Sequence, residues 1–386
     1  MSAPGGEEPA SVPRWSVPLA DVRLPPAAVS AATEVLEGGW LSMGPRVEEF
    51  EHAVAERTGS PFAFACSSGT AALKLALAGA GVGPGDEVVM PSLSFVAGAN
   101  VTRELGAEPV FCDVISEDDL TLSIDSVERS ITPQTTAVIA MHYGGVPCAP
   151  ELVDLAASRG VALIEDAAHA IGASAPPGEC GTWGEAGCFS FFANKNLPLG
   201  EGGMLVTASD ELAEMVRLLR SHGMTTVTWQ RHTGHASSYD VLRPGHNMRL
   251  DEARAAIGTV LLDELDGWNA ARAEHLEALR AGIGPIDGVT MPFARRREGR
   301  SANHLAVCLL GEGIDREEVR ERMRAAGVQT SVHYPPTHLF SAYRGARADV
   351  AVTEAIQERV LTLPLFPHMT AGQRDRVLEA LADSLG

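Results

Sequence analysis

The amino-acid sequence predicts an α/β fold with a mostly parallel central sheet flanked by helices, followed by a smaller α+β unit. Between about residues 60 and 210, short apolar runs alternate with helical stretches, which is the pattern of strands joined by crossover helices. Beyond a long helical stretch, from about residue 251 to 280, this alternation is lost. The chain has 386 residues, a length that suits about two domains.

The elements of the first unit follow in order along the chain. We expect strands at 62–66, 87–90, 108–112, 137–141, 161–165 and 204–207, with a further strand beginning at Cys188. Helices are expected at 71–80, 95–105, 150–159 and 210–220. Because right-handed crossovers bring such strands side by side, their carboxyl ends are expected to meet at one edge of the sheet.

The second unit begins within the long helix, which the Gly- and Pro-containing run at 282–285 ends. We expect strands at 289–292, 304–310 and 330–333, and helices at 315–326, 354–361 and 371–384. The predicted organisation is a disordered leader at 1–14, a large unit at 15–265 and a small C-terminal unit at 266–386. The leader has no apolar core, so it is not interpreted as a signal peptide.

Charge and composition argue against several classes of function. The formal net charge is −20, which disfavours nucleic acids and anionic membrane surfaces as partners. The one basic run, Arg295–Arg297, is interpreted as a solvated loop. No run of about 18 apolar residues is present, so no membrane span is predicted. The six cysteines form no C-x-x-C pair, so we expect no metal site, no disulfides and a reducing, cytoplasmic location.

Lysine is scarce in a way that singles out one residue. Of the 30 basic side chains only two are lysines, Lys74 and Lys195, and the rest are arginines. A lysine that persists where arginine is otherwise preferred can be one that arginine cannot replace, because only a primary amine forms an imine. Lys74 falls in a helical stretch and is interpreted as a surface residue.

Polar residues collect where the predicted strands end. Ser67, Ser68, Asp113, His142 and Asp166 each follow or close an apolar run. Open α/β sheets bind ligands outside the carboxyl ends of their strands. These positions therefore predict the edge of the sheet that carries the site.

Three local patterns suggest the chemistry of that site. Ser67–Thr70 leads from a strand into a helix, which suits a phosphate, although an ordinary helix cap explains it equally. Asp166 ends a strand and suits a cationic ring nitrogen, whose pKa a nearby anion raises; a helix-capping role is the alternative. Lys195 follows an apolar strand that carries one hydroxyl, Ser190, and precedes a glycine-rich turn.

Together these segments carry a resemblance to a known family. The quoted segments are 66–71 (CSSGTA), 91–95 (PSLSF), 165–169 (EDAAH), 189–196 (FSFFANKN), 202–203 (GG), 220–223 (RSHG), 247–249 (NMR) and 331–334 (SVHY). In this order and spacing, the sequence closely resembles the DegT/DnrJ/EryC1/StrS sugar aminotransferases. The resemblance implies a fold-type I enzyme that uses pyridoxal 5′-phosphate (PLP) and works as a homodimer with shared active sites.

The resemblance also implies a role for each matching residue. Lys195 would form the Schiff base with PLP, and Asp166 would keep the pyridine nitrogen protonated. His169 would lie beside the phenolic oxygen of PLP and form a hydrogen bond, and Phe95 would stack on the ring. The phosphate would be held by Ser68, the backbone of Gly69, Ser190 and Asn247, the last from the partner subunit.

Residues for the substrate follow from the same resemblance. Trp40 belongs to a loop at the entrance of the site, His333 and Tyr334 lie where relatives approach the sugar, and Arg249 would bind the carboxylate of the donor. A structural role is the alternative for each. The segment 224–239, with His232 and His235, is interpreted as a specificity loop, a dimer contact or a lid.

The predicted function is a ping-pong transfer of an amino group from glutamate or glutamine to a nucleotide-linked keto-deoxysugar in aminosugar biosynthesis, through pyridoxamine phosphate. An aminocyclitol or other small ketone is an alternative acceptor. A dehydratase of the same family would have histidine in place of Lys195, so that alternative is disfavoured. A non-catalytic regulator or sensor is the alternative from another class.

Overall fold

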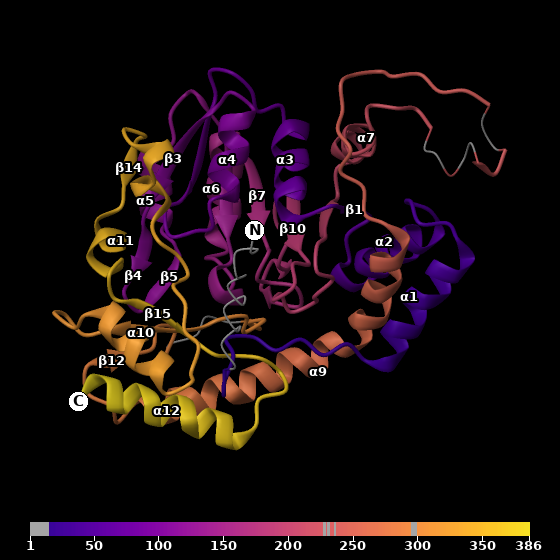
Figure 1. Cartoon of the computed structure of the whole chain (residues 1–386). Helices are drawn as coiled ribbons and strands as arrows, with labels where there is room; N and C mark the ends of the chain where they lie inside the picture. Colours follow the sequence, from indigo (N-terminus) through magenta and orange to yellow (C-terminus); the bar gives the residue numbers. More distant parts are fainter. Residues whose placement is uncertain (1–14, 227–228, 230–231, 235–236, 295–298) are drawn as a thin grey trace, which may run out of the picture.

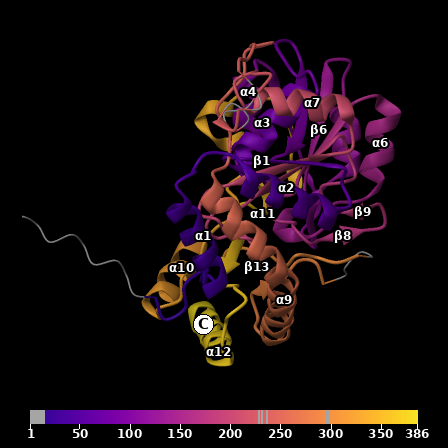
Figure 2. The same cartoon turned by 90° about the vertical axis from the view of Figure 1, so that its right-hand side faces the viewer.

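The computed structural model of the chain describes residues 15–226, 229, 232–234, 237–294 and 299–386. The expected leader at 1–14, the basic run Arg295–Arg297 and His235 of the segment 224–239 lie outside these residues. Figures 1 and 2 show a large unit built on a sheet, and a smaller unit to which the long helix α9 (Glu252–Ile283) leads.

Within the described residues, the main sheet has eight strands in the order β1-β11-β10-β7-β6-β2-β3-β14. In that order their bounds are Phe62–Cys66, Gly203–Thr207, Ala186–Ser190, Ala162–Asp166, Thr135–Met141, Glu87–Pro91, Glu108–Cys112 and Ala348–Asp349. β11 pairs antiparallel with both its neighbours, and the other pairings are parallel. The predicted mostly parallel α/β sheet is confirmed.

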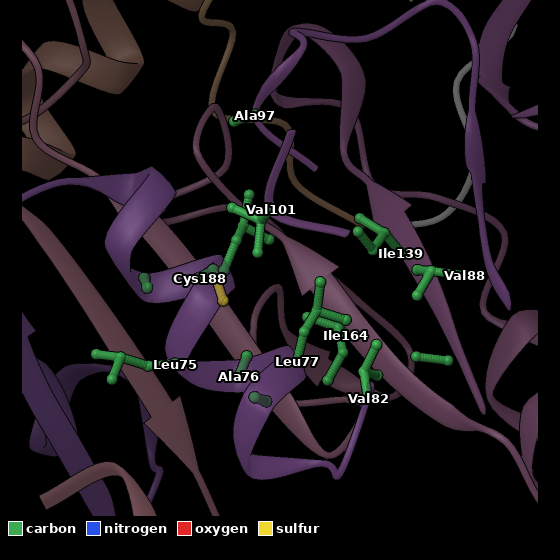
Figure 3. Packing of buried hydrophobic residues seen from close by; sticks show 14 of the residues in the cluster. Leu75, Ala76, Leu77, Val82, Val88, Ala97, Val101, Ile139, Ile164 and Cys188 are labelled. Carbon is green, nitrogen blue, oxygen red and sulfur yellow. The ribbon is translucent and has the colours of Figure 1, made fainter. Parts of the chain in front are cut away.

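Helices cover both faces of this sheet. On one face lie α3 (Gly69–Gly79), α4 (Ala97–Glu104) and α7 (Asp210–Leu219), which share an apolar core with the strands. Figure 3 shows Leu77 of α3 beside Ile164 of β7, in a core that also contains Leu75 and Cys188. The other face is covered by α2 (Pro45–Thr58), α5 (Ile124–Ser130), α6 (Glu151–Arg159) and the first half of α9.

α9 connects the two units. Its residues up to Leu265 pack in the core of the large unit, whereas Leu276 and the residues after it pack in a separate core. That second core includes β12 (Val289–Thr290), β13 (Ala306–Leu310), β15 (Val360–Leu363), α10 (Arg316–Ala325) and α12 (Ala371–Leu385). The change between cores therefore falls just beyond the boundary predicted at residue 265.

Three segments differ from the sequence-based assignment. The strand expected at 330–333 does not form, because only Ser331 pairs there, in an isolated bridge to Thr362. Val17 packs in the small unit and pairs with Val328, so the start of the range assigned to the large unit belongs with the small one. The helix expected at 354–361 is wrong in its second half. It divides into α11 (Ala351–Ile356) and β15, because Val360–Leu363 pairs antiparallel with β13.

The remaining elements are a helix that packs against α9, namely α1, and several short strands and turns. They are α1 (Pro26–Gly38), β4 (Val114–Ser116), β5 (Asp119–Leu122), β8 (Ser174–Ala175), β9 (Gly178–Glu179) and three 3-10 turns at Tyr143–Gly145, Thr337–Leu339 and Ser341–Tyr343. All six cysteines are free and buried. Among the described residues, no helix is both long and apolar enough to cross a membrane.

Beneath the sheet, a buried carboxylate holds the end of β7. Glu165 is fully buried and accepts hydrogen bonds from the backbone N–H groups of Gly181, Trp183 and Gly184 at 2.6, 2.6 and 3.1 Å. Nε2 of His142, which follows β6, lies 2.9 Å from the same carboxylate. Four partners compensate the cost of burying this group, and they tie β6, β7 and the turn before β10 together.

We expect Glu165→Ala to lower the free energy of unfolding by about 3–5 kcal/mol, because it leaves the buried His142, the buried N–H of Gly181 and two part-buried N–H groups without their acceptor. Urea unfolding followed by circular dichroism measures this change. The control is Glu117→Ala, whose carboxylate pairs with Arg359 at 2.9 Å on the surface and should contribute less than about 1 kcal/mol. Equal losses in the two variants would contradict the role given to Glu165.

Candidate active site

A cavity of about 420 Å3 lies beyond the ends of β7 and β10, beside the start of α3. This is the edge of the sheet at which the sequence predicted the site. The cavity is lined by Ser68, Gly69, Thr70, Leu73, Phe95, Ala97, Met141, Asp166, Ala168, His169, Ser190, Phe192, Asn194, Lys195, Glu201, His333 and Tyr334. Its volume is in the range of small-molecule and cofactor sites.

Asp166 is the last residue of β7 and supplies a buried carboxylate to the cavity. One of its oxygens accepts the N–H of Ala168 at 3.1 Å. Burial raises the pKa of this carboxyl, while the Ala168 N–H and the amine of Lys195 act in the opposite direction. Such a carboxylate favours a cationic partner inside the cavity.

Lys195 lies in the turn after β10, where its N–H donates to the carbonyl of Phe192 at 2.9 Å. Burial lowers the pKa of its amine to about 8, and the charge of Asp166 opposes that shift. An ordinary lysine has a pKa of about 10.4. A much larger fraction of Lys195 is therefore neutral, and hence nucleophilic, near neutral pH.

The start of α3 lines the cavity with Ser68, Gly69 and Thr70. Ser68 caps the helix by accepting the N–H of Ala71 at 3.1 Å. The N–H groups of Gly69 and Thr70, which lie between Ser68 and Ala71, have no acceptor among the described residues. A Cβ on Gly69 would lie 2.8 Å from Cβ of Ser190, so glycine lets the helix start approach the end of β10. N–H groups, hydroxyls and the positive end of the helix dipole together suit a phosphate.

Phe95 and Tyr334 form an aromatic wall of the cavity, with ring centroids 5.9 Å apart. Hydrogen bonds between the two loops hold this wall. Thr337 donates its N–H to the carbonyl of Ser92 at 2.8 Å and its hydroxyl to the carbonyl of Ser94 at 3.1 Å. The hydroxyl of Ser92 lies 2.7 Å from Nδ1 of His338. Phe95 itself stays 55% exposed, which leaves a ring face open to a planar ligand.

Three histidines near Lys195 stay neutral. Burial and the charge of Lys195 lower the pKa of His333 to about 4. The pKa values of His169 and His304 lie well below the ordinary value, mainly because both rings are buried. These side chains therefore act in hydrogen bonding and packing and add no positive charge to the site.

Most of the predicted site residues come together in this cavity. Its lining includes the following: Ser68, Gly69, Phe95, Asp166, His169, Ser190, Lys195, His333 and Tyr334. Three others do not line it. Asn247 is exposed beside Ser221, Arg249 donates to the hydroxyl of Ser221 at 3.0 Å, and Trp40 stacks on His232 with centroids 4.6 Å apart.

Two of the polar residues expected at the strand ends face elsewhere. Asp113 accepts the N–H groups of Val352 and Thr353 at 2.7 and 2.8 Å, so it caps α11. His142 points to Glu165 beneath the sheet. Both positions were placed at the site because they follow strands, but side chains alternate between faces along a strand. Lys74, interpreted as a surface residue, pairs with Glu104 at 2.8 Å and is 20% exposed.

A buried network behind Lys195 was not predicted. Asn196 donates to Oδ1 of Asn269 and to the carbonyl of Ala302, both at 2.7 Å. Its own Oδ1 lies 2.9 Å from Nδ1 of His304. The residues involved are 73–108 positions apart in the chain, so no local pattern indicates them. The one available signal is that Asn196 directly follows the scarce lysine.

Comparison with known proteins identifies the family. The sequence profile described as the DegT/DnrJ/EryC1/StrS aminotransferase family matches residues 25–382. The chain belongs to this family. It is 39% identical over 367 residues to the spore coat polysaccharide biosynthesis protein SpsC of Bacillus subtilis (strain 168), covering 92% of this chain and 93% of SpsC.

Solved structures agree with this placement. The aminotransferase TlmJ from Streptoalloteichus hindustanus is 34% identical, with a TM-score of 0.88 over 96% of this chain and 98% of TlmJ. DesV from S. venezuelae, solved in complex with a ketimine intermediate, is also 34% identical, with a TM-score of 0.84 over 92% of this chain and 93% of DesV. The protein is therefore a PLP-dependent aminotransferase of fold type I.

The residues that line the cavity suit PLP. The unfilled N–H groups at the start of α3 suit the phosphate, and the open face of Phe95 suits the ring. Oδ1 of Asn194, which also faces the cavity, is buried without a hydrogen-bond partner among the described residues. An acceptor left in this state is normally satisfied by a ligand or by water.

Replacing each lysine by arginine tests which amine binds the cofactor. We expect Lys195→Arg to abolish the visible absorption band that PLP gives with the wild-type protein, because a guanidinium does not form an imine. Lys74→Arg is the matched control. It keeps the charge that pairs with Glu104 and should keep the band. A band that survives in Lys195→Arg would move the assignment to another residue.

The rate at which that band appears is expected to rise with pH, with a midpoint near 8, because burial lowers the pKa of Lys195 to about 8. Above that pH the amine is neutral and attacks the aldehyde. In Asp166→Asn the midpoint should fall, since Asp166 raises the pKa of Lys195. Stopped-flow absorbance of the PLP-free protein measures both midpoints. A midpoint that rises in Asp166→Asn would contradict this coupling.

Proposed function

We propose that this aminotransferase moves an amino group from glutamate or glutamine to a nucleotide-linked keto-deoxysugar. The observation that carries the proposal is the placement of Lys195 and Asp166 in one cavity together with the start of α3. A relative at 39% identity is named for polysaccharide biosynthesis, which supports a sugar as acceptor. The product would be an aminosugar for a surface glycan or a secondary metabolite, such as an antibiotic.

When bound, PLP supplies the carbonyl that takes up the amino group and the ring that accepts the electron pair of the broken C–H bond. Asp166, buried at the end of β7, would hold a proton on the pyridine nitrogen. Lys195 would bind the cofactor and, once released, carry a proton at Nζ between the substrate carbon and the cofactor. Its pKa of about 8 lets it both accept and return that proton near neutral pH.

The remaining residues of the cavity would hold the reactants in place. Ser68, Ser190 and the N–H of Gly69 would bind the phosphate, and Phe95 would cover one face of the ring. The amino donor and the acceptor would use the same cavity in turn, so the kinetics would be ping-pong. Pyridoxamine phosphate would be the form of the cofactor between the two half-reactions.

A second copy of the chain is proposed to complete each site. Asn247 is exposed outside the cavity of its own subunit, as expected if it reaches the phosphate of a partner. Tyr239, Val241 and Leu242 are between 51 and 59% exposed, which suits burial in a dimer. Trp40 and Arg249 would then serve the partner's substrate rather than their own. Free, buried thiols support a reducing, cytoplasmic location.

Half-reactions measured separately test this function. We expect L-glutamate to convert the visible band of the PLP enzyme to that of the pyridoxamine form, and a nucleotide-linked keto-deoxysugar to restore it. The matched comparison is a ketone of an aminocyclitol pathway, tested at the same concentration. Restoration by that ketone alone would replace the sugar as acceptor. Failure of every ketone after a normal donor step would overturn the proposed acceptor class.

A further inference from the structure

The hydroxyl of Tyr334 is a hydrogen-bonding group in the cavity whose direction the structure determines. Its oxygen lies 2.9 Å from Nε2 of His169. Burial, with Tyr143 and Asp166 nearby, raises the pKa of this phenol well above its ordinary value, so the hydroxyl keeps its proton. Whether that proton points to His169 or into the cavity depends on which nitrogen of His169 carries hydrogen.

The surroundings of His169 decide between the two tautomers. The N–H of Gly144 lies 3.3 Å from Nδ1 and can only donate, so Nδ1 must be the bare nitrogen. The ring is neutral because burial and the charge of Lys195 lower its pKa well below the ordinary value. Nε2 therefore carries the proton and donates it to the oxygen of Tyr334. Both nitrogens of His169 are then engaged within the protein.

The ring of His169 is itself held from behind by His304, with centroids 4.4 Å apart and planes at 36°. His304 is oriented by Asn196. The amide nitrogen of Asn196 donates to Asn269 and Ala302, so its oxygen must face His304 and accept the proton on Nδ1. Asn269 in turn donates to the carbonyl of Ile171 at 3.0 Å. The hydrogen bonds thus fix the orientation of both side-chain amides, those of Asn196 and Asn269. A buried network whose groups are all satisfied in this way is rigid.

The proton of Tyr334 is left with no acceptor among the described residues, although its side chain lines the cavity. A carbonyl oxygen entering the cavity supplies such an acceptor. We propose that Tyr334 donates a hydrogen bond to the carbonyl oxygen of the keto substrate, and that His169, His304 and Asn196 are positioning residues that direct this proton into the cavity. The inference rests on the proposed function insofar as the acceptor is a ketone.

The same arrangement gives His169 a role beside the one that the resemblance implies, a hydrogen bond to the cofactor's phenolic oxygen. His169 would also hold the hydroxyl of Tyr334, which is the member of the pair with a proton still to donate.

Kinetics of the PLP enzyme test the proposal. We expect Tyr334→Phe to lower kcat/KM for the keto substrate by about tenfold, the value of one hydrogen bond made in the transition state. His169→Glu should lose as much, because a carboxylate only accepts and would turn the proton of Tyr334 away from the cavity. His169→Gln retains one donor and one acceptor, so it should lose less than His169→Glu.

A double-mutant cycle separates this mechanism from a general effect of the new charge. If the carboxylate introduced by His169→Glu acts through Tyr334, adding Tyr334→Phe to that variant costs nothing further. Full additivity of the two losses would overturn the proposal. The matched control is Tyr343→Phe, which removes a buried hydroxyl that bonds Asn100 away from the cavity and should leave kcat/KM unchanged.

A spectroscopic readout tests the network independently of turnover. In 15N-histidine spectra of the PLP-free protein, we expect His169 with a bare Nδ1 and a protonated Nε2, and His304 with the opposite tautomer. Asn196→Ala should remove the tautomer preference of His304. A proton on Nδ1 of His169 would overturn the inference.

The two proposals fail in different ways. A wild-type enzyme that aminates no ketone refutes the proposed function, while the histidine tautomers still report whether the network is correct. A Tyr334→Phe variant that aminates the ketone as fast as the wild-type enzyme refutes the inference alone.

Discussion

The geometry of the site depends on a carboxylate that never enters it. Side chains alternate along β7, so Glu165 and Asp166 point to opposite faces of the sheet. Glu165 binds three backbone N–H groups of the turn before β10, and His142 after β6. It thereby sets where β7 and β10 end relative to each other. Since Asp166 closes one strand and Lys195 follows the other, the buried Glu165 determines how the two reactive groups face each other across the cavity.

Asp166 and Lys195 influence one another in a balanced way. Burial disfavours the charged form of each, while each favours the charged form of its partner. The result is an amine with a pKa of about 8, which changes its protonation state readily in the range where enzymes work. Positive charge on the neighbouring histidines would disturb this balance. Burial keeps His169, His304 and His333 neutral, so the site gains their hydrogen bonds and packing without their charge.

The sequence predicted the parts of this site that follow local rules. Lys195 stood out by scarcity, Asp166 by closing an apolar strand, and Ser68 by opening a helix, and all three lie in one cavity. The same rule misplaced Asp113 and His142, because the end of a strand does not indicate which face a side chain takes. The network of Asn196, His304 and Tyr334 could not be predicted, since it joins distant segments through contacts that only the packed fold creates. For the same reason the helix predicted at 354–361 runs into β15 (Val360–Leu363), whose pairing with β13 no local pattern indicates.

The proposed phosphate site uses groups other than lysine. A phosphate could be bound by lysine, but a second primary amine near the cofactor would compete for the same aldehyde. Among the described residues that line the cavity, Lys195 is the only lysine. The start of α3 provides the equivalent of about half a positive charge through N–H groups, and Ser68 and Ser190 add hydroxyls. Neither kind of group forms an imine. A phosphate held by these groups, as proposed, would leave Lys195 as the amine that binds the aldehyde.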